Sequence, residues 1–209
     1  MYSIIIPIYN EKKAIIALLE NLKTIKPKIE VIIIDDGSTD GTNLLLNNAK
    51  DILLIKNKNN IGKGASIVKG LEIAKGENII LVDGDLEVQL NDTNKLIKTF
   101  EEDSEIGAVV GIRWKNSINY SFKILDLGNY ILNSLFNLIY NSKMNDILCC
   151  FKVLPKSTLE SLNLKSNRFS IETEIMSKLI LNKINIKEVE INYTRKSIKD
   201  VKKIKFSDS

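Results

Sequence analysis

Three acidic side chains follow an apolar run in the first half of the sequence. Asp83 and Asp85 stand one residue apart directly after apolar residues 79–82, and Glu87 follows two residues later. Two carboxylates on one turn can share a divalent cation, leaving its other coordination positions for diphosphate oxygens and water, and Glu87 would add a third oxygen. The alternative is a polar turn in which an aspartate caps the next helix. The spacing alone leaves both interpretations open.

A second acidic pair, Asp35 and Asp36, is followed by Gly37 and Ser38 after another apolar run. An aspartate in this place accepts hydrogen bonds from ribose hydroxyls or a base edge, while the glycine lets a ligand approach the backbone. A capped turn is again the alternative. Neither the glycine fingerprint of NAD enzymes nor the phosphate loop of P-loop NTPases occurs in the chain, which argues against both classes.

The composition restricts what these groups can do. The chain has 209 residues, no histidine and a formal net charge of +4. Without histidine, any metal must be held by carboxylates, which favours Mg²⁺ or Mn²⁺. The charge is too small to indicate nucleic acid, but it suits an anionic substrate or a membrane surface. The two cysteines, Cys149 and Cys150, are adjacent, which disfavours a disulfide and indicates a reducing cytoplasm.

Alternating strand and helix patterns position these groups. A continuous β-branched run over residues 3–8 predicts a strand buried on both faces, and 30–34 is a second buried strand. Further strands are predicted over 52–56, 78–82 and 107–112. Periodicity and cap residues predict helices over 11–23, about 40–50, from the loop 59–64 to about 76, and 94–102. This order predicts an α/β fold with a mostly parallel central sheet flanked by helices. Because ligands bind beyond the carboxyl ends of such strands, residues 7–11, 35–40, 83–87 and 113 should meet at one edge.

The second half predicts helices over 120–140 and 170–181 and a strand over 186–191. The segment 120–140 is rich in apolar residues but is interrupted by Asn129, Asn133 and Asn137. It either packs on the sheet or lies in the plane of a membrane interface without crossing it. The end of the chain, residues 195–205, carries six basic residues against one aspartate, which would add attraction to an anionic leaflet. No apolar run is long enough to span a bilayer, and no signal peptide is recognisable.

Four segments of the first half, taken together, resemble the family-2 glycosyltransferases of the GT-A fold. They are residues 5–11, 33–42, 60–65 and 83–87, and their order and spacing match over roughly the first 115 residues. The later part is similar to the dolichol-phosphate mannose synthases and polyprenyl-phosphate glucosyltransferases. The segments that carry this similarity are 111–113, 146–152, 169–174 and 193–195, followed by Lys202 and Lys203.

The resemblance implies a nucleotide-diphospho-sugar transferase fold in one domain over residues 1–209. Residues 1–115 would form the nucleotide-sugar-binding half and residues 116–209 the acceptor-binding half. The positions that match donor-binding residues of the family are Pro7, Tyr9, Glu11, Ile34, Asp36, Lys63, Asp83, Gly84 and Asp85. Asp83 and Asp85 match its metal and diphosphate site, and Glu87 stands where many relatives have glutamine. Asp85 and Arg113 are the expected catalytic residues, and Arg113, Arg195 and Lys203 match phosphate- or acceptor-binding positions.

Two departures from the family pattern stand out. Gly84 replaces the alanine that relatives usually have between the two aspartates, and residues 146–152 replace a more usual Ser/Thr-Gly-Phe-Arg. The first keeps both carboxylates, so the expected metal site is unaffected. The second lies in the acceptor half and bears on the choice of acceptor.

The function implied is inverting transfer of a hexose from a donor of the GDP-mannose or UDP-glucose type to a polyprenyl or dolichyl phosphate. The protein would act peripherally at the cytoplasmic face of the membrane, and Arg113 and Arg195 would orient an acceptor phosphate that is already anionic. A soluble enzyme acting on a hydroxyl acceptor would instead need a carboxylate base, with Glu172, Glu174 and Asp146 as candidates. A non-catalytic sugar-nucleotide-binding protein is the third alternative.

Overall fold

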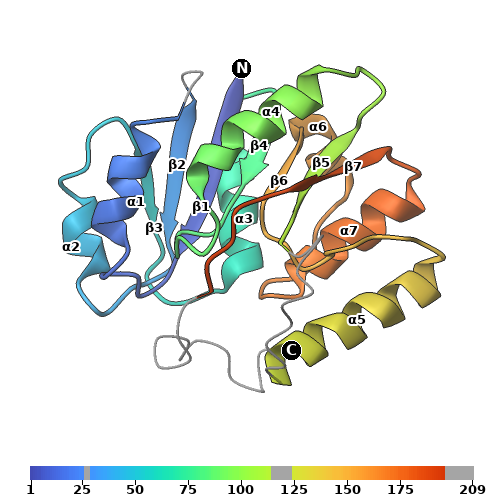
Figure 1. The fold of residues 1–209 in the computed structure, drawn as a ribbon. Coiled ribbons are helices and arrows are strands. Elements are labelled where there is room, and N and C mark those ends of the chain that lie inside the picture. Colours follow the sequence, from blue (N-terminus) through green and yellow to red (C-terminus); the bar gives the residue numbers. More distant parts are fainter. Residues whose placement is uncertain (26–28, 114–123, 196–209) are drawn as a thin grey trace.

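A sheet of seven strands lies at the centre of the computed structural model, which describes residues 1–25, 29–113 and 124–195 (Figure 1). The strands are β1 (Tyr2–Ile8), β2 (Glu30–Asp35), β3 (Leu53–Lys56), β4 (Asn78–Leu81), β5 (Ala108–Ile112), β6 (Lys152–Pro155) and β7 (Ile186–Glu190). The helices are α1 (Ile15–Leu22), α2 (Thr42–Leu46), α3 (Lys63–Ile73), α4 (Thr93–Glu101), α5 (Ile124–Tyr140), α6 (Lys156–Ser161) and α7 (Ile171–Leu181). A short 3₁₀ helix, η1 (Leu90–Asp92), precedes α4.

The strands are ordered β3-β2-β1-β4-β6-β5-β7. Every described pair is parallel except those of β6, which runs antiparallel to both β4 and β5. The predicted α/β architecture with a mostly parallel sheet is confirmed. The sequence analysis did not predict β6, which separates two strands that follow one another along the chain.

The strand β1 shows why continuous apolar runs form the centre of this sheet. Ile4, Ile6 and Ile8 face one core, which α1 and α4 cover, while Ile5 faces the other, which α3 and α7 cover. All four side chains are almost completely buried. A strand that is buried on both faces has no polar side, so a β-branched run suits it better than an alternating pattern.

The predicted helices are present with shifted ends. The helix expected over 11–23 covers Ile15–Leu22, and the one expected over about 40–50 covers only Thr42–Leu46. The helix expected over 120–140 is described from Ile124 onward, and residues 114–123 lie outside the described part of the chain.

Helix α5 lies beside α7 and away from the sheet (Figure 1). Phe136 is buried in the core, with its ring 4.5 Å from that of Tyr140. Most of the other apolar side chains are exposed, namely Leu127, Tyr130, Ile131, Leu132, Leu135, Leu138 and Ile139. Most of the apolar surface of this helix therefore does not pack on the sheet.

Candidate functional site

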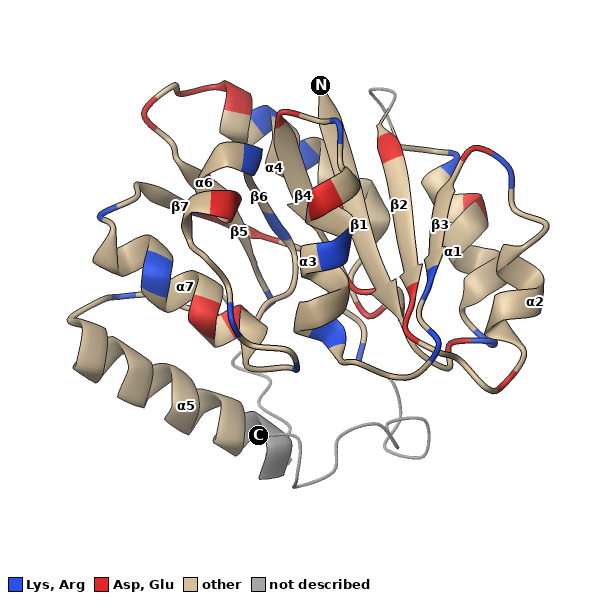
Figure 2. Ribbon diagram, turned by 180° about the vertical axis from the view of Figure 1, so that it is seen from behind, with Lys and Arg blue, Asp and Glu red and all other residues tan. Residues whose placement is uncertain are grey.

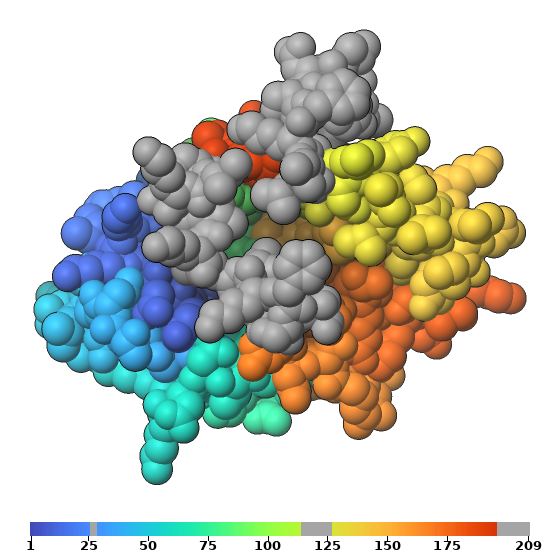
Figure 3. Space-filling view, turned by 90° about the horizontal axis from the view of Figure 1, so that it is seen from below, coloured from blue at the N-terminus to red at the C-terminus, as the bar shows by residue number. Residues whose placement is uncertain are grey.

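The carboxyl ends of the parallel strands open onto one edge of the sheet, as predicted. Hydrogen bonds join the loops there: the Asp36 amide donates to the Ile8 carbonyl (2.8 Å) and the Asn10 amide to the Ser38 hydroxyl (2.9 Å). Figure 3 looks onto this edge and shows the N-terminal segments on one side and α5 with the segment before α7 on the other. The predicted site residues Tyr9, Asp36, Asp83 and Arg113 belong to these loops.

The turn that carries the two aspartates packs tightly on the end of β1. A methyl group at Gly84 would come within 2.7 Å of Cγ1 of Ile8, so glycine allows an approach that alanine would obstruct in this chain. One oxygen of Asp85 accepts a hydrogen bond from the Glu87 amide (3.0 Å). The Asp83 side chain is 30% exposed, so its carboxylate remains accessible at the edge of the sheet.

A chain of four alternating charges runs inward from Asp83. The Lys63 ammonium, at the start of α3, lies 2.6 Å from Oδ1 of Asp83 and 2.7 Å from Oε1 of Glu172. The other Glu172 oxygen accepts a hydrogen bond from Lys152, whose ammonium also donates to the carbonyl of Cys149. Lys152 is completely buried, and Glu172 and Lys63 nearly so.

The pKa values of Lys63 and Glu172 follow from these contacts. Burial alone would lower the pKa of Lys63, but the Asp83 and Glu172 carboxylates outweigh it and raise the pKa well above its usual value. Burial alone would raise the pKa of Glu172, but Lys152 and Lys63 lower it. Lys63 and Glu172 are therefore both charged near neutral pH.

Arg113, the first residue after β5, is held by Asp146. Nε of Arg113 donates to Oδ2 of Asp146 (2.7 Å) and Nη2 to Oδ1 (2.8 Å), a bidentate pair, and the Arg113 amide also donates to Oδ2 (3.1 Å). The guanidinium lies over the ring of Tyr193, 5.4 Å from its centroid. Burial alone would lower the pKa of Arg113, but Asp146 raises it above its usual value. Arg113 is thus a fixed positive charge at the predicted edge.

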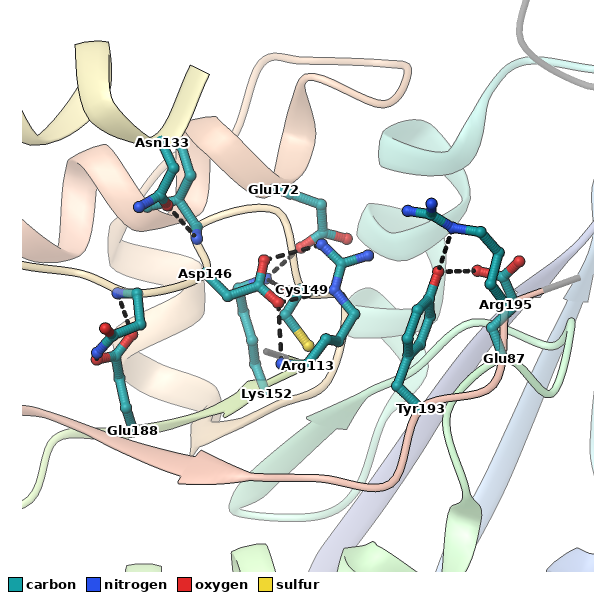
Figure 4. Close-up of polar contacts among 12 residues, drawn as sticks. Glu87, Arg113, Asn133, Asp146, Cys149, Lys152, Glu172, Glu188, Tyr193 and Arg195 are labelled. Carbon is teal, nitrogen blue, oxygen red and sulfur yellow. Dashed lines mark hydrogen bonds and ion pairs between the residues drawn. The ribbon is translucent and has the colours of Figure 1, made fainter. Parts of the chain in front are cut away.

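Tyr193 connects this arginine to the turn after β4 (Figure 4). Its hydroxyl donates to Oε2 of Glu87 (3.1 Å) and accepts from Nε of Arg195 (3.3 Å). The backbone reinforces the contact through an antiparallel bridge between Val88 and Tyr193. Burial raises the pKa of Tyr193. Tyr193 had no role in the sequence analysis, where it was only part of the motif around Arg195.

The Glu87 carboxylate was predicted as a third metal ligand, and in the structure it accepts a hydrogen bond from Tyr193. Within residues 1–25, 29–113 and 124–195, no three acidic or cysteine side chains converge as metal ligands. The two carboxylates of Asp83 and Asp85 stay together on one turn, and their oxygens are the donors that Mg²⁺ and Mn²⁺ prefer. The donor set fits a cation that takes its remaining ligands from a diphosphate and water.

The predicted nucleoside-binding residues surround the ends of β1 and β2. Asp36 is buried, and its carboxylate accepts hydrogen bonds from the Ile61 amide (3.0 Å), the Gly62 amide (2.8 Å) and the side chain of Asn57 (2.8 Å). It therefore holds the loop before α3, and its contact with a donor remains a prediction. Pro7 and Ile34 are paired in register across β1 and β2, and the side chain of Ile34 belongs to the core. The Glu11 carbonyl accepts the first hydrogen bonds of the turn leading into α1.

The glycines that flank Lys63 allow another loop to approach. A methyl group would lie 2.3 Å from the Asn167 carbonyl oxygen if placed on Gly62, and 1.9 Å from that of Ser166 if placed on Gly64. The Ala65 amide donates to the Asn167 oxygen (3.1 Å). These glycines thus bring the segment before α7 against α3, which places Glu172 within reach of Lys63. Lys203, predicted to bind phosphate, and the basic segment from 196 onward lie outside the described residues.

Sequence comparison identifies relatives over most of the chain. Residues 3–162 match the family model described as Glycosyl transferase family 2. An uncharacterized protein of Methanocaldococcus jannaschii is 34% identical over 170 residues, which cover 76% of this chain and 73% of that protein. The dolichyl-phosphate beta-glucosyltransferase of Dictyostelium discoideum is 27% identical over an alignment of 218 positions, covering 92% of this chain and 66% of that protein. The chain spans about two thirds to three quarters of the length of these two relatives.

Comparison with solved structures supports the same fold. The glucosyl-3-phosphoglycerate synthase of Mycobacterium tuberculosis, in complex with Mn²⁺, UDP-glucose and glycerol 3-phosphate, superposes with a TM-score of 0.69. The match covers 96% of this chain and 74% of that chain, at 14% sequence identity. At this identity the likeness establishes a shared GT-A architecture.

Proposed function

Because the chain belongs to glycosyl transferase family 2, we propose that it transfers a hexose, with inversion, from a nucleotide-diphospho-sugar to a polyprenyl phosphate. The curated relative from Dictyostelium discoideum is named for a reaction of this kind. In this proposal residues 1–115 bind the donor, residues 116–209 bind the acceptor, and the reaction takes place at the cytoplasmic face of a membrane.

The bonding of the three candidate bases is the observation that favours a phosphate acceptor over a hydroxyl acceptor. Glu172 is buried between two lysines, both oxygens of Asp146 are bonded to Arg113, and Glu174 accepts hydrogen bonds from Lys178 and two backbone amides. The pKa values of Glu172 and Glu174 are lowered, whereas an efficient general base has a pKa near the working pH. A phosphate acceptor needs no such base because it is already anionic.

The cationic side chains suit that acceptor. Arg113 is a fixed charge beside the turn of the two aspartates, and Tyr193 holds Arg195 to the same region. A guanidinium carries five donors, so Arg113 can stay bonded to Asp146 while it donates to a phosphate oxygen. In this proposal the two arginines orient the acceptor phosphate and keep its attacking oxygen directed at the sugar. Lys203 would add a third positive charge.

The Asp83 and Asp85 carboxylates would hold Mg²⁺ or Mn²⁺ together with the donor diphosphate. When bound, the cation would neutralise negative charge that develops on the leaving nucleoside diphosphate. In the structure Lys63 forms an ion pair with Asp83 and a second one with Glu172. The pair with Glu172 would keep the Lys63 ammonium beside the diphosphate when Asp83 binds the cation.

The exposed face of α5 supports contact with a lipid surface. Leu138 is 79% and Ile139 72% exposed, and no charged residue occurs between residues 127 and 140 (Figure 2). An uncharged apolar helix at the rim of the site suits the interfacial region of a bilayer, where the phosphate of a polyprenyl lipid is found. None of the described helices is both long and apolar enough to cross a bilayer.

The central experiment is a donor screen that measures release of nucleoside diphosphate with Mg²⁺ or Mn²⁺ and a short polyprenyl phosphate. We expect release that depends on the lipid phosphate. Asp85→Asn should lower the rate on the order of 10²-fold or more while the protein stays folded, because it removes a charged metal ligand. Transfer to a hydroxyl acceptor instead, or no turnover with any acceptor, would contradict the proposal.

Membrane contact has its own test. Wild-type protein should co-sediment with anionic vesicles at low salt, and Leu138→Glu combined with Ile139→Glu should abolish this binding. Leu181→Glu is the matched control, because Leu181 is 67% exposed but lies at the end of α7. Equal loss in both variants, or no vesicle binding by the wild type, would contradict a role of α5 at the membrane.

A further inference from the structure

The side of α5 opposite its exposed apolar face is joined to the segment that follows the helix. Asn133 donates a hydrogen bond from Nδ2 to the Met144 carbonyl (2.8 Å) and accepts one from the Ile147 amide (3.0 Å). Asn137 also donates to the Met144 carbonyl (2.8 Å) and accepts from the Met144 amide (3.0 Å) and the Ser142 hydroxyl (2.7 Å). Two of the three asparagines that interrupt the apolar pattern of this helix, Asn133 and Asn137, therefore connect it to residues 142–147.

Asp146 lies between the two residues that Asn133 bonds. It belongs to no helix or strand, so its position depends on the contacts of its neighbours. On one side Asn133 fixes Met144 and Ile147, and on the other Glu188 of β7 accepts hydrogen bonds from the amide (2.7 Å) and side chain (2.5 Å) of Asn145. Figure 4 shows Asn133 and Glu188 beside the segment that carries Asp146, and the carboxylate of Asp146 bonded to Arg113.

The guanidinium of Arg113 is oriented by its bidentate pair with Asp146 and lies over the ring of Tyr193. Asp146 contacts Nε, Nη2 and the backbone amide of Arg113, and it is 3% exposed. A shift of the Asp146 carboxylate would therefore move the guanidinium, because a bidentate pair tolerates little change in angle. The contacts of Asn133 on both sides of Asp146 help to set where that carboxylate lies.

We propose that Asn133 is a positioning residue for Arg113, acting through Met144, Ile147 and Asp146. The role of Arg113 toward the acceptor phosphate rests on the proposed function, whereas the chain of contacts does not. The helix that presents its apolar face to the lipid is then also the helix that holds the acceptor arginine. The two hydrogen bonds of Asn133 then link that helix to the segment that carries Asp146.

The first arm of the test reads the position of Arg113 without any reaction. The chain has only three arginines, so the Nε–H signal of Arg113 in a ¹⁵N-edited spectrum can be assigned by its loss in Arg113→Lys. In Asn133→Ala we expect this proton to exchange with solvent about tenfold faster or more, because its bond to Asp146 opens more often. Ser134→Ala is the matched control, since Ser134 is the neighbouring residue on the exposed side of the helix, and it should leave the exchange rate unchanged.

The second arm is a double-mutant cycle on sugar transfer to the short polyprenyl phosphate. Asn133→Ala should lower kcat about tenfold or more with the affinity for the donor unchanged, and Ser134→Ala should have no effect. In the Arg113→Lys background the same substitution should cost less than about twofold, because the group that Asn133 positions is already altered. Asn133→Asp keeps the acceptor for the Ile147 amide and should fall between wild type and Asn133→Ala, which also guards against an alanine variant that folds poorly.

The outcomes separate the two proposals. If the wild type transfers no sugar to a polyprenyl phosphate, the proposed function fails, and the exchange of the Arg113 Nε proton still decides whether Asn133 positions the guanidinium. An unchanged exchange rate in Asn133→Ala overturns the positioning role. So does a cycle in which the losses from Asn133→Ala and Arg113→Lys simply multiply, since two independent structural defects would behave in that way.

Discussion

Glu172 is the carboxylate on which two buried lysines depend, and its substitution tests the energetics of the site. Glu172→Gln keeps the size of the side chain but removes its charge. Lys152 then keeps the Cys149 carbonyl and can bond the uncharged amide oxygen of glutamine, but it loses its negative partner, whereas Lys63 keeps Asp83. The Lys152 side chain is completely buried, so its ammonium cannot recover the lost interaction by solvation.

The expected cost follows from burial. The Lys152 side chain is 0% exposed and that of Glu172 6%, so the pair is not weakened by solvent. Removing one partner of such a pair costs about 3–5 kcal/mol, because the other charge is left uncompensated. Folded proteins are stable by about 5–15 kcal/mol, so the variant should still fold but with a much smaller free energy of unfolding. At about 2–4 °C per kcal/mol for a chain of this size, the midpoint of thermal unfolding should fall by roughly 6–20 °C.

Urea unfolding at neutral pH measures this loss, and two further variants make it specific. Glu160→Gln removes the carboxylate of an exposed pair with Lys156 and should change stability by less than about 0.5 kcal/mol. Adding Lys152→Met to Glu172→Gln removes the uncompensated charge and should return stability to within about 1 kcal/mol of wild type. A Glu172→Gln protein that is inactive but as stable as wild type would refute this reasoning and point to Glu172 as a general base.

Three further predictions concern separate parts of the site. Hydrogen bonds from Lys178 and backbone amides lower the pKa of Glu174 from 4.5 to about 2 against the effect of burial, so its contribution to stability is present above pH 4.5 and lost as the pH falls toward 2. Glu174→Gln should therefore flatten the fall in stability on acidification, as followed by urea unfolding at a series of pH values. Arg113→Lys should lower kcat for lipid phosphate by about 10–100-fold with donor affinity unchanged, because an ammonium cannot replace the planar fork on Asp146, and equal kinetics would make Arg113 a mere surface charge. Gly64→Ala should destabilise the protein by about 1–3 kcal/mol in denaturant unfolding, because the methyl group would meet the Ser166 oxygen, and an unchanged midpoint would contradict that contact.

The sequence was sufficient to predict the strands whose two faces are both buried. β1, β2 and β4 contain isoleucine-rich runs, and their loops meet at one edge as the alternation of strands and helices predicts. β6 was missed because it is short and begins with a lysine. Lys152 can occupy a buried position because Glu172 neutralises it. That partner lies twenty residues away in another element, so no local sequence pattern predicts it.

The site was predicted in place but not in its connections. The order of strands and helices correctly predicted that the turn of the two aspartates and Arg113 lie at one edge of the sheet, since their placement depends on sheet topology. It did not indicate that Asp146 would hold Arg113, that Glu87 would bond Tyr193, or that two asparagines of α5 would bond the Met144 carbonyl. These contacts join residues that are far apart in the sequence, and several polar partners of similar chemistry were available to each.

The position of β6 between β4 and β5 has a consequence for synthesis of the chain. The ribosome makes β4 and β5 before β6, so neither strand can acquire its shared neighbour until residues 152–155 have emerged. Until then both strands have an edge with unpaired backbone groups next to apolar side chains, which favours association with other chains. β7 joins on the far side of β5 later still. The half of the molecule that is translated first therefore cannot complete its sheet alone, and it reaches its final form only when nearly all of the described chain has been made.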